Sequence, residues 1–359
     1  MNAIKQIAEL GQSLWLDNLS RMLVKQGGLA QLITDDGVSG VTSNPSIFHN
    51  AIATGTDYAE DLARLKLAEP DAERRYESLV IPDIQAACDL MHPVFERTHG
   101  DDGYVSLEVA PRWAYDTDAT VAEGQRLAAQ VARANLLVKV PGTPEGALAF
   151  ETLTRLGINV NVTLLFSVAQ TERVWEAYIR GLTARVAAGL DIRHSKAVAS
   201  LFLSRVDTLI DARLTENGSP AALALRGKAA VAMAKNAYRR YEELFKDASF
   251  AHLEQVGGRP QYLLWASTGV KNPAYSDLMY VEPLIGAETI NTLPDKTLDA
   301  IRDHGKPALN LALGLGEANV QLAELAQLGI DMDSVGETLQ VDGVKQFTTA
   351  FDKLLALMV

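Results

Sequence analysis

The sequence predicts a (β/α)8 barrel, and three observations lead to that prediction. Eight short apolar runs recur along the 359 residues, and most are separated by stretches in which apolar residues recur every three or four positions. Strands that alternate with helices predict a parallel sheet, and eight such units favour a closed barrel over an open sheet. No Ser-, Gly- or Pro-rich linker divides the chain and no repeat has a fixed period. We therefore expect a single domain over residues 1–359.

The eight predicted strands are, in chain order, SLWLD (13–17), GVTSN (40–44), YVSLEVA (104–110), LLVKV (136–140), INVNVT (158–163), KAVASLFL (196–203), YLLWAST (262–268) and MYVEPLI (279–285).

Two regions exceed the minimum needed for such a barrel. Residues 51–103 are expected to form two or three helices between the second and third strands. Their apolar residues fit one helical face, and Pro82 and Pro93 are expected to start or kink helices there. Residues 206–258 predict a long helical insertion between the sixth and seventh strands, with a break at ENGSP (216–220). This second insertion also offers a surface for a homo-oligomer.

Composition narrows the functional classes. Hydrophobic residues make up 48% of the chain and charged residues 22%, a mixture typical of soluble globular proteins. No apolar run approaches the roughly 18 residues of a membrane helix, and MNAIKQIAELGQ does not resemble a signal peptide. The net charge of −12 disfavours nucleic-acid binding but permits a local cationic pocket for a phosphate ester. The single cysteine, Cys88, cannot form an internal disulfide and is expected to be a small core residue, so we expect a cytoplasmic location.

Motifs for bound cofactors are not found. The six histidines show no HExxH pattern and no paired spacing, so we expect no metal site. GLGEAN (314–319) lacks the third glycine and the preceding strand of a dinucleotide-binding motif.

The predicted strands end in polar residues, and in such barrels catalytic side chains come from the carboxyl ends of the strands. The polar residues that these strands carry, or that follow them directly, are Asp17, Asn18, Thr42, Ser43, Asn44, Glu108, Lys139, Asn159, Asn161, Thr163, Ser200, Ser204, Arg205, Ser267, Thr268 and Lys271. Simpler explanations exist for single members of this set. Asp17 could cap a helix, Asn44 could be a turn residue, and Glu108 could pair with Arg112 on the surface. Polar residues on successive strands nevertheless predict one polar barrel mouth.

Lys139 lies within the otherwise apolar run LLVKVPGT (136–143). Lysine is almost never fully buried without a partner, and burial favours the neutral amine. A neutral amine can attack a ketone and form a Schiff base, which accepts electrons when a neighbouring carbon–carbon bond breaks. Asp17 and Glu108 are the candidates for moving protons, and Thr163 is the natural side chain to hold a relaying water close to Glu108.

Six segments, in order, resemble the transaldolase family in its longer bacterial form. The segments are WLDNLSR (15–21), GVTSNPSIF (40–48), VSLEVAPR (105–112), LLVKVPGT (136–143), INVNVTLLFS (158–167) and VASLFLSRVD (198–207). The resemblance covers nearly the whole chain. It implies a single barrel without metal or organic cofactor, and a transferase of aldehyde or ketone residues. The expected reaction moves a dihydroxyacetone unit from sedoheptulose 7-phosphate to glyceraldehyde 3-phosphate, giving erythrose 4-phosphate and fructose 6-phosphate in the pentose phosphate pathway.

The resemblance also implies roles for single residues. Lys139 matches the Schiff-base lysine, Asp17 the acid/base acting on the sugar hydroxyl, and Glu108 with Thr163 the pair that holds the catalytic water. The residues implied to bind substrate are Asn44 and Asn161 at sugar hydroxyls, Ser200 and Arg205 at the phosphate, and Phe202 at the cavity wall.

The chain departs from the family pattern after the seventh strand. Many members have an arginine there, whereas WASTGVKN has Lys271. Lysine can hold a phosphate as a point charge but not with a bidentate fork. We assign Lys271 to the phosphate site on this basis.

Two other functions are open at this level. One is a fructose 6-phosphate aldolase, which would use the same lysine chemistry but release the three-carbon fragment, as shorter relatives do. The other is a non-catalytic sugar-phosphate-binding barrel, although a mere binding protein needs no amine in an apolar strand.

Overall fold

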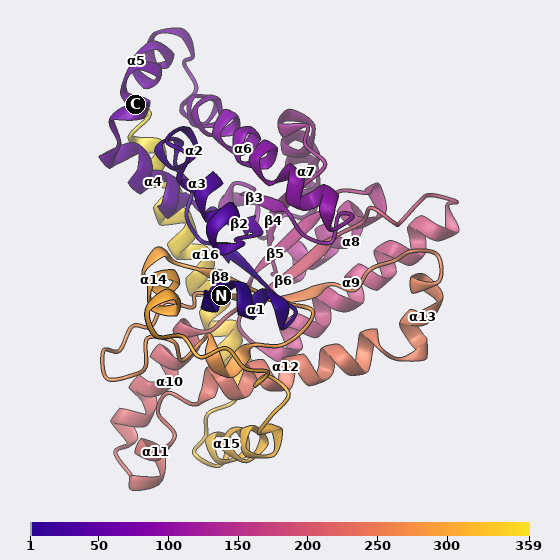
Figure 1. The fold of residues 1–359 in the computed structure, drawn as a ribbon, viewed down its shortest axis with the longest axis vertical. Coiled ribbons are helices and arrows are strands. Elements are labelled where there is room, and N and C mark those ends of the chain that lie inside the picture. Colours follow the sequence, from indigo (N-terminus) through magenta and orange to yellow (C-terminus); the bar gives the residue numbers. More distant parts are fainter. Residues whose placement is uncertain (1) are drawn as a thin grey trace.

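A computed structural model describes residues 2–359 and shows a closed barrel of eight parallel strands, surrounded by helices (Figure 1). Each strand pairs with the next along the chain, and β8 closes the barrel on β1. The predicted fold class is therefore confirmed. The strands are β1 Gln12–Leu16, β2 Gly40–Val41, β3 Tyr104–Glu108, β4 Leu136–Pro141, β5 Val160–Leu165, β6 Ala197–Phe202, β7 Tyr262–Ala266 and β8 Thr289–Leu293.

The predicted position of the eighth strand is wrong. Residues 279–285 form a loop that contains a short 3-10 helix, η4 (Glu282–Leu284), and the strand follows at β8. Pro283 cannot donate the backbone hydrogen bond that a central strand needs. The segment is apolar because most of its side chains are buried against the barrel. Its backbone is also satisfied there, since the carbonyl of Leu284 accepts hydrogen bonds from the side chains of Gln12 (2.7 Å) and Trp265 (3.2 Å). Apolar character alone could not separate this buried loop from a strand.

The helices cover the outside of the barrel, and none in the described part of the chain is long and apolar enough to cross a membrane. They are α1 Ala3–Glu9, α2 Arg21–Lys25, α3 Gly28–Gln31, α4 Pro45–Thr54, α5 Ala59–Ala68, α6 Ala72–Arg97, α7 Thr117–Val131, α8 Pro144–Leu156, α9 Val168–Ala187, α10 Ser204–Asn217, α11 Pro220–Ala224, α12 Ala229–Phe245, α13 Ala248–Glu254, α14 Asp295–His304, α15 Leu315–Gln327 and α16 Met332–Ala356. Short single-turn helices are η1 Leu32–Asp36, η2 Thr56–Tyr58 and η3 Pro111–Trp113.

Both predicted helical regions are helical. Between β2 and β3 the chain forms α4, α5 and α6, and both Pro82 and Pro93 lie inside the 26-residue α6 instead of starting new helices. Between β6 and β7 it forms α10 to α13, and α10 ends at Asn217 before Gly218, whose φ of +67° suits glycine. The organisation as one domain over residues 1–359 stays a prediction.

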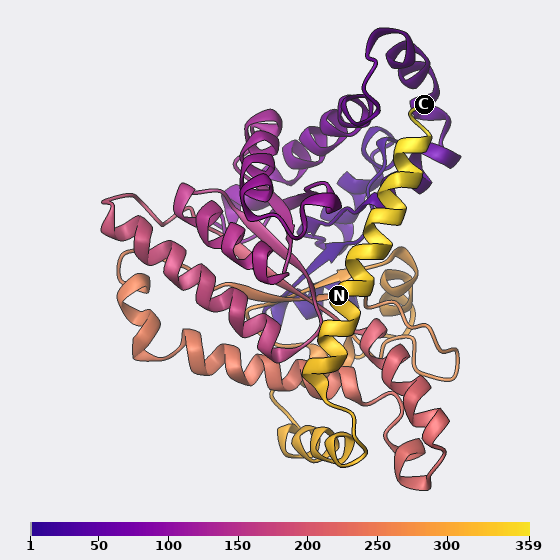
Figure 2. The ribbon, with the colours of Figure 1, turned by 180° about the vertical axis from the view of Figure 1, so that it is seen from behind.

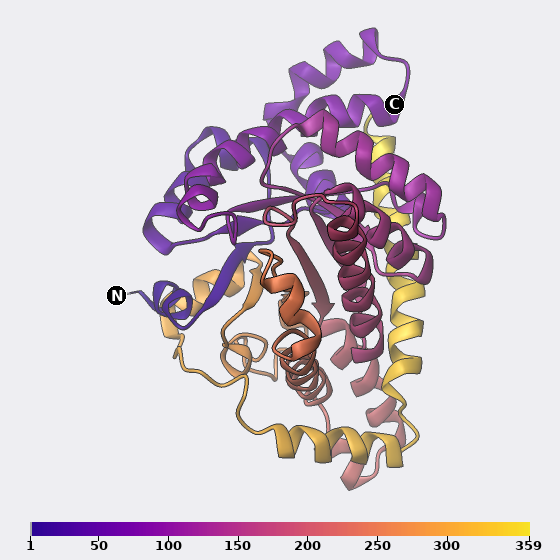
Figure 3. The same cartoon turned by 90° about the vertical axis from the view of Figure 1, so that its right-hand side faces the viewer.

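The last helix, α16, positions part of the barrel mouth. It runs along one side of the molecule, with the chain end beside α4 and α5 (Figure 2). Figure 3 shows it on the side opposite the N-terminus. The amide of Gln340 donates hydrogen bonds to the carbonyls of Gly142 (2.9 Å) and Leu164 (3.0 Å), at the carboxyl ends of β4 and β5. These bonds fix α16 against the end of the barrel where catalytic groups are expected.

Candidate active site

Parallel pairing aligns three of the predicted site residues on neighbouring strands. Glu108 on β3 is in register with Lys139 on β4, and Lys139 is in register with Asn161 on β5. All three therefore lie at one level near the carboxyl end of the barrel.

Lys139 lies on the wall of a cavity of about 180 Å³ in the barrel mouth. The residue is 5% exposed. Its Nζ donates a hydrogen bond to the carbonyl of Ser43 (2.9 Å) and lies 3.7 Å from Oε2 of Glu108. The amine is thus held toward the neighbouring side of the barrel, where β2 and β3 end, and it lies on the cavity wall.

Glu108 is a buried carboxyl group with unused hydrogen-bonding capacity. Neither carboxylate oxygen has a hydrogen-bond partner among the described residues. Burial raises the pKa of Glu108 to about 7, although the neighbouring Lys139 opposes that rise. The alternative that Glu108 pairs with Arg112 on the surface is wrong, because Arg112 pairs with Glu73 (2.6 Å) instead. A carboxyl group that titrates near neutrality can both give and accept a proton.

Thr163 lies at an irregularity in β5. The pairing of β5 with β6 shifts register between Val162 and Leu165, and Leu164 has a φ of +60°. Bulges of this kind redirect side chains next to active sites. Thr163 lines the cavity, and its buried Oγ1 has no hydrogen-bond partner among residues 2–359. Its hydroxyl is therefore available to a water or a substrate.

Asp17 follows β1 and also lines the cavity. Its Oδ1 accepts a hydrogen bond from Oγ1 of Thr42 (2.9 Å), which lies 2.6 Å from Oγ1 of Thr292. Burial raises the pKa of Asp17 above its ordinary value, and Lys139 and the Thr42 bond oppose the rise. The alternative role as a helix cap is wrong, since Ser20 caps α2.

Asn161 and Ser200 form a buried polar pair. Oγ of Ser200 donates to Oδ1 of Asn161 (2.7 Å), and Nδ2 of Asn161 donates to Oγ of Ser106 (3.1 Å). Ser200 lines the cavity, whereas Asn161 is fully buried behind it. These bonds fix the orientation of both side chains.

Of two other asparagines at predicted strand positions, Asn44 lies at the cavity and Asn159 lies at the far end of the barrel. Asn44 lines the cavity and also caps α4, because its Oδ1 accepts from the backbone N–H of Ile47 (3.1 Å). The cap leaves its amide Nδ2 as the group that can face a ligand. Asn159 precedes β5 and bonds the backbone of Lys196 (2.9 Å), at the opposite end of the barrel from the mouth.

Arg205 brings a cationic group to the cavity wall from the first turn of α10. Its Cζ lies 5.4 Å from the ring centre of Phe202 and 5.8 Å from that of Phe347. Its buried Nη1 has no hydrogen-bond partner in the described chain, and burial lowers its pKa from the ordinary arginine value. A guanidinium near two rings and with an unused donor is suited to bind an anion.

Lys271 does not line this cavity. It lines a neighbouring depression with Ser204, Asp207 and Tyr275, although its charge is close enough to Asp17 to lower the pKa of that carboxyl group. Its role at a phosphate stays a prediction.

Sequence reasoning assigned no role to seven further residues of the cavity wall. Thr42 and Ser267 are recognisable in the sequence only as polar residues at strand ends, and Ser267 has a φ of +54°. Thr292 was missed because it lies on the misplaced eighth strand, and Phe347 comes from α16 at the far end of the chain. The others are Ser46, Leu264 and Ala266.

A carboxylate cluster lies outside the mouth. Glu73, Glu77 and Glu123 each place an oxygen within 4.8 Å of the other two. Arg126 pairs with Glu77 and Glu123, and Arg112 pairs with Glu73. Each of the three carboxylates is therefore already paired with an arginine.

Comparisons with known proteins agree over the whole length of the chain. The family described as "Transaldolase/Fructose-6-phosphate aldolase" matches residues 14–358. A protein named Transaldolase from Thiobacillus denitrificans is 65% identical over 356 residues, which are 99% of each chain. One of the same name from Neisseria gonorrhoeae is 49% identical over 359 residues and 100% of each chain. Another from Mycolicibacterium smegmatis is 45% identical over 350 residues, 97% of this chain and 94% of the relative.

Proposed function

The chain belongs to the transaldolase/fructose-6-phosphate aldolase family, and on that premise we propose that it is a transaldolase with Lys139 as its covalent nucleophile. It transfers a dihydroxyacetone unit between sugar phosphates. One observation carries the proposal: the recessed amine of Lys139 lies 3.7 Å from a carboxylate whose oxygens are otherwise unbonded within residues 2–359.

The first steps form the imine. Nζ of Lys139 attacks the ketone carbon C2 of sedoheptulose 7-phosphate, and the carbonyl oxygen takes a proton to give a carbinolamine. Glu108 donates a proton to the departing hydroxyl, which leaves as water, and Thr163 holds that water. A pKa of about 7 lets Glu108 return to either protonation state at neutral pH.

The next step breaks a carbon–carbon bond. Asp17 takes the proton from the C4 hydroxyl, the C3–C4 bond breaks, and its electron pair moves to the iminium, leaving an enamine on Lys139. Erythrose 4-phosphate leaves. The enamine carbon then attacks the aldehyde of glyceraldehyde 3-phosphate, Asp17 returns its proton to the new hydroxyl, and water releases fructose 6-phosphate. The raised pKa of Asp17 supports its role as proton acceptor.

The remaining wall residues bind the sugar phosphate. Asn44 and Ser200 meet sugar hydroxyls or the phosphate from the cavity wall, and Asn161, buried behind Ser200, reaches a sugar hydroxyl only through the side chain of Ser200, which it holds in place. Arg205 holds the phosphate with Phe202 packed beside its guanidinium. Lys271 adds a point charge from the neighbouring depression once a ligand is bound.

A fructose 6-phosphate aldolase is the second candidate, because the matching family includes that activity in its description. The two differ in the fate of the enamine. Incubation with fructose 6-phosphate and no acceptor should give a lasting adduct and little free dihydroxyacetone for a transaldolase. Rapid release of dihydroxyacetone would favour the aldolase.

We place the protein in the cytoplasm, acting on sugar phosphates without metal or organic cofactor and without nucleic-acid or membrane partners. Cys88 is a buried free thiol, as a small core residue would be, and burial raises its pKa to about 12. Residues 206–258 remain the proposed surface for a homo-oligomer.

Lys139→Ala tests the proposal most simply. The variant should lose measurable transfer activity while its circular dichroism spectrum stays unchanged, and Lys228→Gln, an exposed lysine on the outer surface, serves as control. Full activity in the alanine variant would reject Lys139 as nucleophile.

A further inference from the structure

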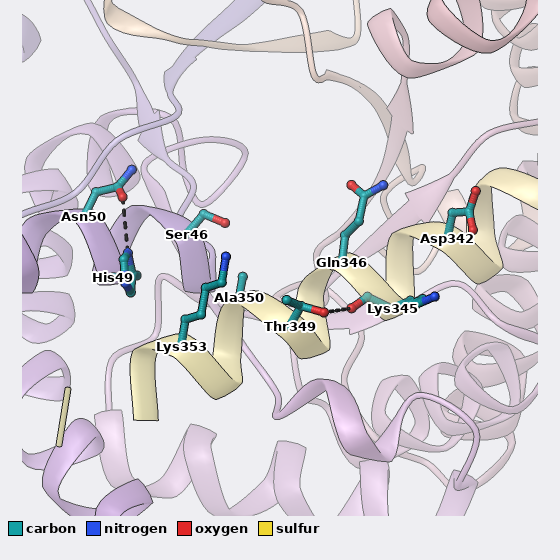
Figure 4. Close-up of a pocket in the computed structure, with 9 residues that line it drawn as sticks. All are labelled: Ser46, His49, Asn50, Asp342, Lys345, Gln346, Thr349, Ala350 and Lys353. Carbon is teal, nitrogen blue, oxygen red and sulfur yellow. Dashed lines mark hydrogen bonds between the residues drawn. The ribbon is translucent and has the colours of Figure 1, made fainter. Parts of the chain in front are cut away.

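A groove of about 730 Å³ lies between α4 and α16, beside the barrel mouth (Figure 4). Ser46, His49 and Asn50 line it from α4, and Lys345, Thr349 and Lys353 line it from α16. Residues three, four or eight positions apart lie on one side of a helix, so each helix presents a single polar face to the groove.

Helix packing does not explain this polar lining. α16 packs on the protein through its other face, where Val344, Phe347, Phe351 and Leu354 are buried. Facing surfaces of packed helices are ordinarily apolar. Here the space between the two helices is lined by amines, amides and hydroxyls, which suits a polar ligand.

The groove is continuous with the catalytic cavity. Ser46 lines both, and the consecutive residues Gln346 and Phe347 line the groove and the cavity respectively. A ligand in the groove would therefore lie at the rim of the site that contains Lys139.

The groove is cationic in a chain whose net charge is −12. Neither Lys345 nor Lys353 forms an ion pair with a carboxylate among the described residues, and Asp342 is the single acidic group on the wall. In Figure 4 the side chain of Lys353 extends from α16 into the groove. Nδ1 of His49 lies 3.3 Å from Oδ1 of Asn50, which leaves the Asn50 amide nitrogen as a donor. Local positive charge attracts an anion that the molecule as a whole repels.

We propose that this groove is a second phosphate-binding site, distinct from Arg205, that holds the phosphate end of an aldose phosphate entering or leaving the mouth. The inference rests on the proposed function. The catalytic cavity, about 180 Å³, is partly filled while dihydroxyacetone is attached to Lys139. While this intermediate lasts, one aldose phosphate leaves and another enters, and a phosphate site at the rim would hold either of them during that exchange. Lys345 and Lys353 supply charge, and the amides of Asn50 and Gln346 supply further donors for a phosphate monoester.

The test compares two double variants of equal charge. Lys345→Gln/Lys353→Gln removes both groove amines, whereas the control Lys228→Gln/Lys306→Gln removes two exposed lysines elsewhere. Inorganic phosphate is the probe, titrated calorimetrically at low salt. The wild type and the control should bind two phosphates per chain, and the groove variant one. Arg205→Ala should also retain one, at the groove.

Kinetics distinguish substrate docking from binding of free phosphate. The groove variant should raise the KM for glyceraldehyde 3-phosphate about 3- to 10-fold, the range expected when two exposed charges are lost. The KM for unphosphorylated glyceraldehyde should not change. Added salt should raise the wild-type KM toward that of the variant.

Two results would overturn the proposal. One is unchanged phosphate stoichiometry in the groove variant. The other is lost phosphate binding with an unchanged KM for the aldose phosphate, which would mean that the groove binds free phosphate and has no part in docking. Borohydride trapping of dihydroxyacetone by the wild type tests the proposed function separately, because this donor carries no phosphate.

Discussion

Glu108 is expected to destabilise the folded chain at neutral pH, and Glu108→Gln should remove that cost. Burial raises its pKa from 4.5 to about 7, so the folded chain binds this proton more tightly than the unfolded chain does. The loss of unfolding free energy caused by ionised Glu108 is therefore absent below about pH 4.5, grows between pH 4.5 and 7, and is constant above pH 7. The rise in pKa from 4.5 to about 7 corresponds to a loss of about 3 kcal/mol in unfolding free energy above pH 7.

Glutamine resembles the protonated acid in size and charge, so the variant should lack this penalty. The charged groups that act on Glu108 are Lys139, Asp17 and Arg205, and all three remain in the variant. The unfolding free energy of the variant should match that of the wild type near pH 4.5. It should exceed the wild-type value by up to about 3 kcal/mol at pH 8.

Urea unfolding of both proteins between pH 4.5 and 8 measures this difference. Exposed Glu337→Gln on α16 is the control and should show no such trend. The stabilised variant should also lose about 100-fold or more in kcat, because an amide cannot exchange a proton with the imine water. A stability difference that does not change with pH, or a variant less stable than the wild type at pH 8, would show that ionised Glu108 does not destabilise the fold.

Three further substitutions test other parts of the site. Asp17→Asn should slow transfer about 100-fold or more in a coupled assay while Lys139 still forms an adduct with dihydroxyacetone; unchanged transfer would reject the assigned role. Arg205→Ala should raise the KM of fructose 6-phosphate about 10-fold or more and leave reaction with unphosphorylated donors unchanged. An equal effect on both kinds of donor would mean that Arg205 does not bind the phosphate. Ser200→Ala should lower the unfolding free energy by about 1–3 kcal/mol in urea, because Oδ1 of Asn161 loses its donor within the core; an unchanged value would mean that the pair does not stabilise the fold.

The position of Lys139 on its strand separates it from the other buried lysine of the barrel. Lys196 is also buried, but it precedes β6 at the amino end of the barrel. There its Nζ lies 2.7 Å from Oδ1 of Asp101 and 3.8 Å from the ring centre of Tyr262. That lysine has a close counter-ion and an aromatic ring, as a structural residue should. Lys139 lies near the carboxyl end of its strand, faces a cavity, and is 3.7 Å from Glu108.

Parallel strands explain why much of the site was predictable. Once Glu108, Lys139 and Asn161 are assigned to consecutive strands, the register of a closed barrel brings them together. The family resemblance drawn from the six segments is confirmed by the family match over residues 14–358 and by the 65% identical relative, whereas the roles of the single residues stay predictions.

The contributions of β8 and α16 were not predictable in the same way. Thr292 lies on TINTL, a strand with fewer apolar residues than the buried loop that precedes it. Phe347 reaches the cavity from a helix whose apolar face looks like any other core face, and only tertiary packing places it there. The bulge at Thr163 depends on the register between β5 and β6, which no local pattern encodes.

The most direct test of covalent catalysis is mass spectrometry of the protein after borohydride reduction in the presence of fructose 6-phosphate. The expected result is a single reduced dihydroxyacetone adduct on the peptide that contains Lys139, and no adduct in Lys139→Ala. An adduct on another lysine such as Lys196, or no adduct in a protein that turns over substrate, would exclude covalent catalysis by Lys139.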